Sequence, residues 1–143
     1  MTRAEITAFF APYSAMYIVK FGGMVYASPT RAWVEGPFYD YFKKMLWNAG
    51  EDTWAVKWEC RDFSRAYACF AQLCNALTPG SPKGIDALAV GEVWFHPDAN
   101  AVGENHAINA IIGDGDLFFI DPQNGREWKM SVSELESITF LRF

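Results

Sequence analysis

The chain has 143 residues, of which 51% are hydrophobic and 17% aromatic. This length fits one domain, and the apolar content is enough to bury a full core, which excludes a disordered chain. The formal net charge of −5 argues against a nucleic-acid surface and against docking on anionic lipid, because both need a basic patch. No stretch approaches the roughly 18 apolar residues of a membrane span.

The beginning of the chain and its cysteines indicate a compartment. The first residues show no apolar segment followed by a small-residue cleavage site, so we expect no signal peptide. The three cysteines are an odd number and form no Cys-x-x-Cys motif, which favours free thiols in a reducing environment. We therefore expect a cytoplasmic protein that carries no cofactor and no metal.

The first third of the chain is predicted to be mainly helical and aromatic. Residues 2–5 fit a capping box for a helix that ends before Pro12. Residues 17–26, with a central Gly-Gly pair, resemble a small hairpin. A second helix is expected to begin at Pro37 and to stop at Gly50. Aromatic side chains in this part are expected to pack in the core or to line a groove.

The clearest helix begins at about residue 60, after an extended lead-in over residues 52–59. Its apolar side chains recur at helical spacing and predict one core-facing stripe. The segment 78–82, which contains two prolines and a glycine, ends this helix. The members of the stripe are Phe63, Tyr67, Phe70, Cys74 and Leu77.

From residue 87 the hydrophobic pattern changes to that of strands. Strands are expected over 87–95, 106–112, 117–121 and 138–142, with turns at 113–116 and at Asn124-Gly125. Helices followed by an antiparallel sheet predict an α+β fold. We expect one domain over 1–143, with an N-terminal helical and aromatic part (1–53) and a core (54–143) that carries the site.

Three residues in this core have the types and contexts of a cysteine nucleophile site. Cys60 opens the long helix, His106 opens a strand and Asp121 closes the next strand. A thiol at a helix N-terminus, an imidazole and an orienting carboxylate are the parts that such a site needs. Cys69 and Cys74 lie inside the helix and lack this position.

The loop between the two strands decides whether the imidazole and the carboxylate share a face. A two-residue loop at Gly113-Asp114 sets His106 directly opposite Asp121, with Cβ atoms about 5 Å apart. A four-residue loop sets Asp121 opposite Ile108 and keeps it on the face of His106. A three-residue loop puts the two side chains on opposite faces.

Each of these residues also has a purely structural interpretation. A cysteine is often a small buried hydrophobe, a histidine at a strand start is often structural, and Asp-Pro-x-Asn-Gly is good turn chemistry. His96, Asp98, Glu104 and His106 suggest a metal site only weakly, because no tight ligand spacing exists. Residues 114–116 resemble a fragment of a calcium loop but fit a tight hairpin turn better.

Three short motifs resemble those of a known enzyme superfamily. Residues 60–64 look like a nucleophile that opens a helix, residues 105–107 like a His-Ala step at a strand start, and residues 119–122 like a strand that ends in Asp-Pro. The chain thereby resembles the transglutaminase-like superfamily of papain-fold cysteine enzymes, including small bacterial and phage members. The resemblance covers roughly residues 54–128, with 46 residues from Cys to His and 15 from His to Asp.

The resemblance implies a helix-borne cysteine packed on an antiparallel sheet that presents the other two residues. It implies a hydrolase or acyl transferase that works through a thioester, as a cysteine protease, deamidase or transglutaminase, on a peptide or protein substrate. Cys60 would be the nucleophile, His106 the general base and then acid, and Asp121 the residue that orients the imidazole.

The second oxyanion donor is less well defined by the resemblance. Papain-type enzymes carry a glutamine before the cysteine, and no glutamine precedes Cys60 here. The indole N–H groups of Trp54 and Trp58 are the candidate replacements, and Asn105 stands where the family often has glycine.

Two further functions fit the same composition. A non-catalytic module could recognise a peptide, a sugar or a protein by stacking on exposed aromatic side chains. An inhibitor or effector could grip a partner protein through the aromatic-rich first 50 residues. The enzyme predicts one hyper-reactive thiol at Cys60, whereas the binding module predicts ordinary reactivity there.

Overall fold

The computed structural model describes residues 1–13, 18–20, 23, 25–51, 58–77, 86–98 and 104–143. Its centre is a six-stranded sheet with the strand order β1-β8-β4-β5-β6-β7. The parallel pair β1–β8 lies at one edge, and the other neighbours pair antiparallel. The strands are β1 (Ile18–Lys20), β4 (Val90–Phe95), β5 (His106–Gly113), β6 (Asp116–Asp121), β7 (Arg126–Glu127) and β8 (Phe140–Arg142).

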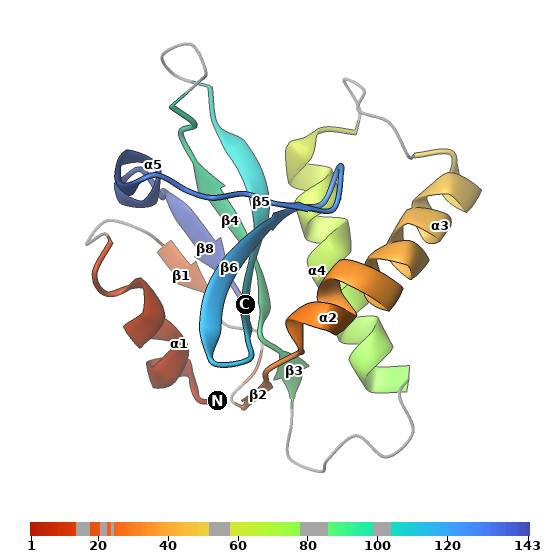
Figure 1. Ribbon diagram of the computed structural model, residues 1–143, viewed down its shortest axis with the longest axis horizontal. Coiled ribbons are helices and arrows are strands. Elements are labelled where there is room, and N and C mark those ends of the chain that lie inside the picture. Colours follow the sequence, from red (N-terminus) through yellow and green to blue (C-terminus); the bar gives the residue numbers. More distant parts are fainter. Residues whose placement is uncertain (14–17, 21–22, 24, 52–57, 78–85, 99–103) are drawn as a thin grey trace.

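Helices cover both faces of this sheet, as Figure 1 shows. The first face is covered by α1 (Arg3–Phe10), with α5 (Val132–Glu136) near one end of the sheet. The second face is covered by α4 (Cys60–Leu77), and beside α4 lie α2 (Arg31–Trp33), the π-helical segment η1 (Val34–Phe38) and α3 (Tyr39–Ala49).

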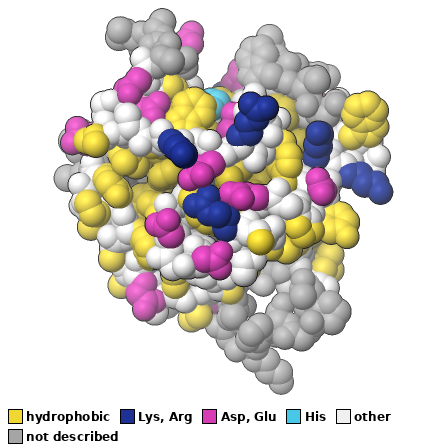
Figure 2. All heavy atoms as spheres, in the orientation of Figure 1, with side chains coloured by type: hydrophobic (Ala, Val, Ile, Leu, Met, Phe, Trp, Pro, Cys, Tyr) yellow, Lys and Arg dark blue, Asp and Glu magenta, His cyan; other side chains and the backbone are white. Residues whose placement is uncertain are grey.

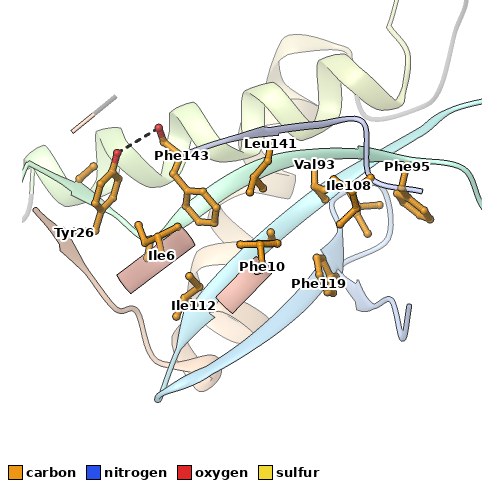
Figure 3. Packing of buried hydrophobic residues seen from close by; sticks show 14 residues of the cluster. Ile6, Phe10, Tyr26, Val93, Phe95, Ile108, Ile112, Phe119, Leu141 and Phe143 are labelled. Carbon is orange, nitrogen blue, oxygen red and sulfur yellow. Dashed lines mark hydrogen bonds between the residues drawn. The ribbon is translucent and has the colours of Figure 1, made fainter. Parts of the chain in front are cut away.

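Each layer of helices closes one hydrophobic core. On the first face, Ile6 and Phe10 of α1 pack in one cluster with the C-terminal Phe143 (Figure 3). Ile108 and Ile112 of β5, whose side chains point to this face, belong to the same cluster. On the second face, Phe38 and Phe42 meet Tyr67 of α4. Burial of these side chains at roughly 25 cal/mol per Å² is the main force that holds the layers together.

The helix ends follow the predicted capping chemistry in part. The Thr2 hydroxyl and the Glu5 carboxylate form the expected capping box, and Gly50 ends α3 with a left-handed φ of 72°. Gly36 has a non-helical φ of −111° and ψ of −106°, so the helical run that continues into α3 begins at Pro37, as predicted. The helical turn α2 before this kink, which Thr30 caps, was not predicted.

The small hairpin predicted over residues 17–26 is wrong. In the described residues, β1 pairs with β8, and β2 (Tyr26–Ala27) pairs in parallel with β3 (Ala87–Leu88). Both partners are far away in the sequence, and a local Gly-Gly signal contains no information about them. The lead-in over 52–57 lies outside the described residues.

The prediction also missed α5. Its sequence signal was present, because Ser131 and Glu134 form a complete capping box. The helix has only five residues, which is too short to show a hydrophobic period.

The hairpin between β5 and β6 turns at Asp114 and Gly115, which have φ angles of 54° and 83°. Positive φ at both positions is typical of a type I′ turn, so the hairpin interpretation of residues 114–116 is confirmed.

Candidate functional site

Two buried hydrogen bonds fix the first turns of α4 against the beginning of β5, and a third ties the same Asn109 amide to β4. The Ser64 hydroxyl donates to the Ile108 carbonyl at 2.8 Å. The Asn109 amide donates to the carbonyls of Ser64 at 2.9 Å and Gly91 at 3.0 Å. Ser64 and Asn109 are fully buried, so these bonds are strong positional restraints. They bring the start of α4, and with it Cys60, to the end of the sheet where β5 begins.

The sheet register places His106 and Asp121 on one face. Asn109 pairs with Ile120, so the next position along β6 brings Asp121 opposite Ile108. This is one of the two even registers expected from the sequence, and the predicted common face is confirmed. The Asp121 charge acts on His106 and favours its protonated form.

The environment of Cys60 does not favour a thiolate. Burial raises the pKa of this half-buried thiol, and hydrogen bonding to the backbone of Ala107 and Arg61 opposes the rise only in part. No hydrogen bond joins Cys60 to His106 among the described residues.

His106 is held by aromatic rings. Its imidazole lies 5.1 Å from the Trp128 ring and 5.8 Å from the Phe95 ring, measured between centroids. Burial lowers the pKa of His106, and the charges of Asp121 and Glu134 counter this effect. A half-buried imidazole packed against two aromatic rings is an ordinary structural element.

Both carboxylate oxygens of Asp121 serve the turn that follows it. Oδ1 accepts the Gln123 N–H at 2.9 Å, and Oδ2 accepts the Asn124 side-chain amide at 2.8 Å. The Asp121 carbonyl also accepts the Gly125 N–H at 2.8 Å. The turn chemistry of Asp-Pro-x-Asn-Gly is therefore realised, and His106 receives the charge of Asp121 without a hydrogen bond to it.

Two of the three other candidate residues lie in the part of the chain that the structure describes. Trp54 lies outside the described residues. Trp58 is half-buried with its ring edge-on to Phe63, and its indole N–H has no partner among the described residues. Asn105 is exposed just before β5.

The residues considered for a metal do not converge. Asp98 accepts hydrogen bonds from the hydroxyls of Ser131 and Ser133, both at 2.6 Å, and His96 is exposed. In the part of the chain that the structure describes, no three His, Cys, Asp or Glu side chains are grouped to hold an ion.

A groove between α3 and α4 is a second candidate site; the sequence raised an aromatic groove as one alternative for the first third of the chain but did not place it. It has a volume of about 710 Å³ and a mainly apolar lining, with one amide and one ammonium group. Tyr41, Leu73 and Leu77 on its walls are 64%, 50% and 71% exposed. The side chains that line it are Trp33, Tyr41, Lys44, Met45, Asn48, Phe70, Leu73, Cys74 and Leu77.

The apolar stripe of α4 explains why this groove was missed. Phe63 and Tyr67 are buried as predicted, but Phe70 and Cys74 are half-buried and Leu77 is exposed. The stripe therefore leaves the core along the helix and becomes a wall of the groove. In Figure 2, hydrophobic side chains gather with charged ones over α3, at the right of the view.

Solved structures share the fold of this chain, and two of them are described below. The structure described as a PSL1a–E64 complex matches with a TM-score of 0.70 and 18% identity, over 100% of this chain and 50% of that one. The Polyporus squamosus lectin bound to the epitope Neu5Acα2-6Galβ1-4GlcNAc matches with a TM-score of 0.65 and 20% identity, over 87% of this chain and 42% of that one.

The chain thus spans about half the length of the solved structures it matches. At these identities the likeness shows the fold alone. No protein-family model and no curated protein matches the sequence.

These comparisons correct the resemblance drawn from the motifs. One of the structural neighbours is described as a lectin, and this likeness contradicts the assignment to the transglutaminase-like, papain-fold superfamily. The expected fold class and the expectations of a cysteine protease, a hydrolase and a catalytic triad are contradicted with it. The physical reason is that each motif is short and has a structural use here, such as the turn that Asp121 caps.

In the described residues, no helix is both long enough and apolar enough to cross a membrane.

Proposed function

We propose that this chain is a binding module without turnover, and that it holds a saccharide in the groove between α3 and α4. The observation that carries the proposal is the lining of this groove, in which aromatic faces stand beside an amide and an ammonium group. Ligand sites are typically concave and mainly apolar, with a few polar groups that orient the ligand.

The chemistry of the lining suits a sugar ring. The Trp33 ring is stacked on Phe38 with centroids 4.6 Å apart, so its position is fixed. Tyr41 is largely exposed and can cover one face of a ring, while Asn48 and Lys44 offer hydrogen bonds to hydroxyl groups. Rigid aromatic side chains give contact area at a low cost in conformational entropy.

The structural neighbours support a sugar as the first class of ligand to test. One of them is described as a lectin bound to Neu5Acα2-6Galβ1-4GlcNAc. This chain spans only about half of each neighbour, so the glycan named there is a starting probe for this chain. A cytoplasmic location and the single domain over 1–143 stay predictions.

The test uses a panel of neutral and sialylated oligosaccharides that includes this trisaccharide, with binding read by isothermal titration calorimetry. We expect at least one member to bind, and Tyr41→Ala to weaken binding about tenfold through loss of a stacked ring. Trp47→Ala is the matched control, because Trp47 is 71% exposed on the same helix but does not line the groove. Absence of binding across the panel would overturn the proposal, as would equal losses in both variants.

A reactive thiol at Cys60 is the second candidate function. It is favoured by the convergence of Cys60, His106 and Asp121 at one end of the sheet, and by the neighbour described as a complex with E64. In the structure, burial disfavours both the Cys60 thiolate and the His106 imidazolium, which is why this candidate stands second.

Intact-mass analysis after incubation with E64 separates the two candidates. The binding module predicts no adduct on the native chain. A single adduct that is absent in Cys60→Ala and slowed in His106→Ala would establish the reactive thiol and would shift the search to electrophilic substrates.

A further inference from the structure

We propose that Arg61, Arg65 and Arg142, arranged around the ring of Trp94, form a second site that binds the carboxylate of an acidic saccharide. The site lies on the second face of the sheet, where the first turns of α4 run beside β4, the neighbour of β8. It is separate from the α3–α4 groove, and the proposal does not depend on binding in that groove.

The register of two strands sets the floor of this arginine site. Glu92 pairs with Arg142, and Trp94 pairs with Phe140, so all four side chains share one face. The rings of Trp94 and Phe140 lie 4.7 Å apart at an angle of 36°, and both are half-buried. The sheet therefore presents an aromatic platform next to a guanidinium group.

Helix α4 supplies the other two cations. Arg61 and Arg65 are one turn apart and share a side of the helix. The Arg61 guanidinium carbon lies 5.9 Å from the centroid of the Trp94 ring. The side chains of Arg61, Arg65 and Arg142 are 54%, 48% and 39% exposed, so a ligand can reach them.

A fully buried carboxylate anchors the site from below. Glu92 is 0% exposed, and its Oε1 accepts the indole N–H of Trp94 at 2.8 Å. The same carboxylate lies 3.7 Å from Arg65 Nη2 and 3.1 Å from Arg142 Nη2. One buried charge thus positions the aromatic platform and two of the guanidinium groups.

Arg61 Nη2 donates to Glu59 Oε2 at 2.9 Å, whereas the guanidinium groups of Arg65 and Arg142 lie beside Glu92 without a hydrogen bond to it. Glu92 Oε2 accepts no hydrogen bond among the described residues despite its 3.1 Å approach to Arg142, so the N–H groups of Arg142 are not aimed at it. Neither Arg65 nor Arg142 donates a side-chain hydrogen bond to any described residue. These donors are available for a carboxylate, which guanidinium groups bind with a matching fork geometry.

Stability does not account for this arrangement. A buried ion pair rarely stabilises a protein more than apolar residues of the same volume would. A carboxylate under two half-exposed arginines is better explained as preorganisation of a binding site. A flat indole beside the cations favours an acid carried on a sugar ring, since the ring can stack while the carboxylate meets the guanidinium groups.

The probe is a hyaluronan tetrasaccharide, which carries glucuronate carboxylates, and its matched control is the same sugar with the carboxylates reduced to alcohols. Isothermal titration calorimetry at two salt concentrations should show binding of the acid at least about tenfold tighter than binding of the reduced form. Arg142→Gln should remove this preference, whereas Arg126→Gln, which removes an exposed charge elsewhere, should keep it.

Glu92→Gln distinguishes binding at an ordered arginine site from general electrostatic attraction of the acid to the protein surface. This variant makes the chain less acidic, so a field effect would strengthen binding of the acid, whereas loss of the anchor should weaken it about tenfold. Thermal melts check that each variant is folded, and Arg142→Gln carries the test if Glu92→Gln is not.

Three results would overturn the proposal. The first is equal affinity for the acid and its reduced form, and the second is a loss in Arg126→Gln equal to that in Arg142→Gln. The third is equally tight binding of a tetraglutamate peptide, which would assign the site to acidic polypeptides. Retention of binding in Tyr41→Ala is expected, and its loss would contradict the separation of this site from the groove.

Discussion

Tyr67 lies in the core beneath the α3–α4 groove and carries a buried hydroxyl group that has no hydrogen-bond partner among the described residues. It is 0% exposed, its ring makes edge contacts with Phe38 at 4.8 Å and Phe42 at 5.0 Å, and its hydroxyl has no partner among the described residues. Burial also raises the pKa of this phenol. A buried hydroxyl without a hydrogen bond costs about 1–3 kcal/mol of stability.

Tyr67→Phe removes the hydroxyl and keeps the ring contacts. We expect the free energy of unfolding in urea to rise by about 1 kcal/mol, and the melting temperature to rise by roughly 3 °C in a chain of this size. Ligand affinity in the groove should stay unchanged, because Tyr67 lies below its surface.

Tyr26→Phe is the matched control. The Tyr26 hydroxyl is also buried, but it accepts the Gly23 N–H at 2.8 Å and lies 3.4 Å from the Phe143 carbonyl (Figure 3). Its removal leaves a buried N–H without an acceptor and should lower the free energy of unfolding by about 1–2 kcal/mol. If Tyr67→Phe destabilised the chain as much as Tyr26→Phe, its hydroxyl would have a partner and the reasoning would fail.

Three further predictions concern the backbone, the histidine and the thiol. Gly91→Ala should lower the free energy of unfolding by about 2 kcal/mol or more, since its Cβ would stand 2.7 Å from a backbone carbonyl of β8, whereas Gly36→Ala meets no atom within 4 Å and should cost little. Burial lowers the pKa of His106 below its ordinary value of 6.5, so the unfolded chain binds a proton at this residue more readily than the folded chain. The free energy of unfolding, measured by urea midpoints, should therefore fall as the pH drops through 6.5. His106→Gln should reduce this pH dependence. Burial raises the pKa of Cys60, so iodoacetamide at pH 7.5 should label it more slowly than the exposed Cys69, as read by mass spectrometry; faster labelling of Cys60 would favour the reactive thiol.

Local chemistry made several elements predictable from the sequence. The capping box at Thr2, the stop at Gly50 and the long helix from Cys60 depend on neighbouring residues, and all three are present. The parity of the β5–β6 hairpin was also decided locally, by the turn at Asp114 and Gly115.

Long-range pairing and side-chain surroundings were not predictable. The partners of β1 and β2 lie far along the chain, so a local Gly-Gly pair led to the wrong hairpin. The order of Cys60, His106 and Asp121 predicted their proximity, but their protonation depends on burial and on the Asp121 turn, which appear only in three dimensions.

The sequence signals for the α3–α4 groove and for the arginine site are of different kinds. The groove arises where the apolar stripe of α4 continues past the core to Leu77. The sequence pattern of an apolar stripe is the same whether another element covers it or leaves it exposed. The arginine site needs Glu92 and Arg142 to be neighbours, which only the pairing of β4 with β8 establishes.

The most direct test of the binding-module proposal is a titration of the ¹⁵N-labelled chain with the best-binding saccharide of the panel, followed by backbone and indole chemical shifts. We predict saturable shifts at Trp33, Tyr41 and Asn48, with the signals at Cys60 and His106 unmoved. Shifts centred on Cys60 and His106, or no saturable shift anywhere, would contradict the claim that the α3–α4 groove holds the ligand.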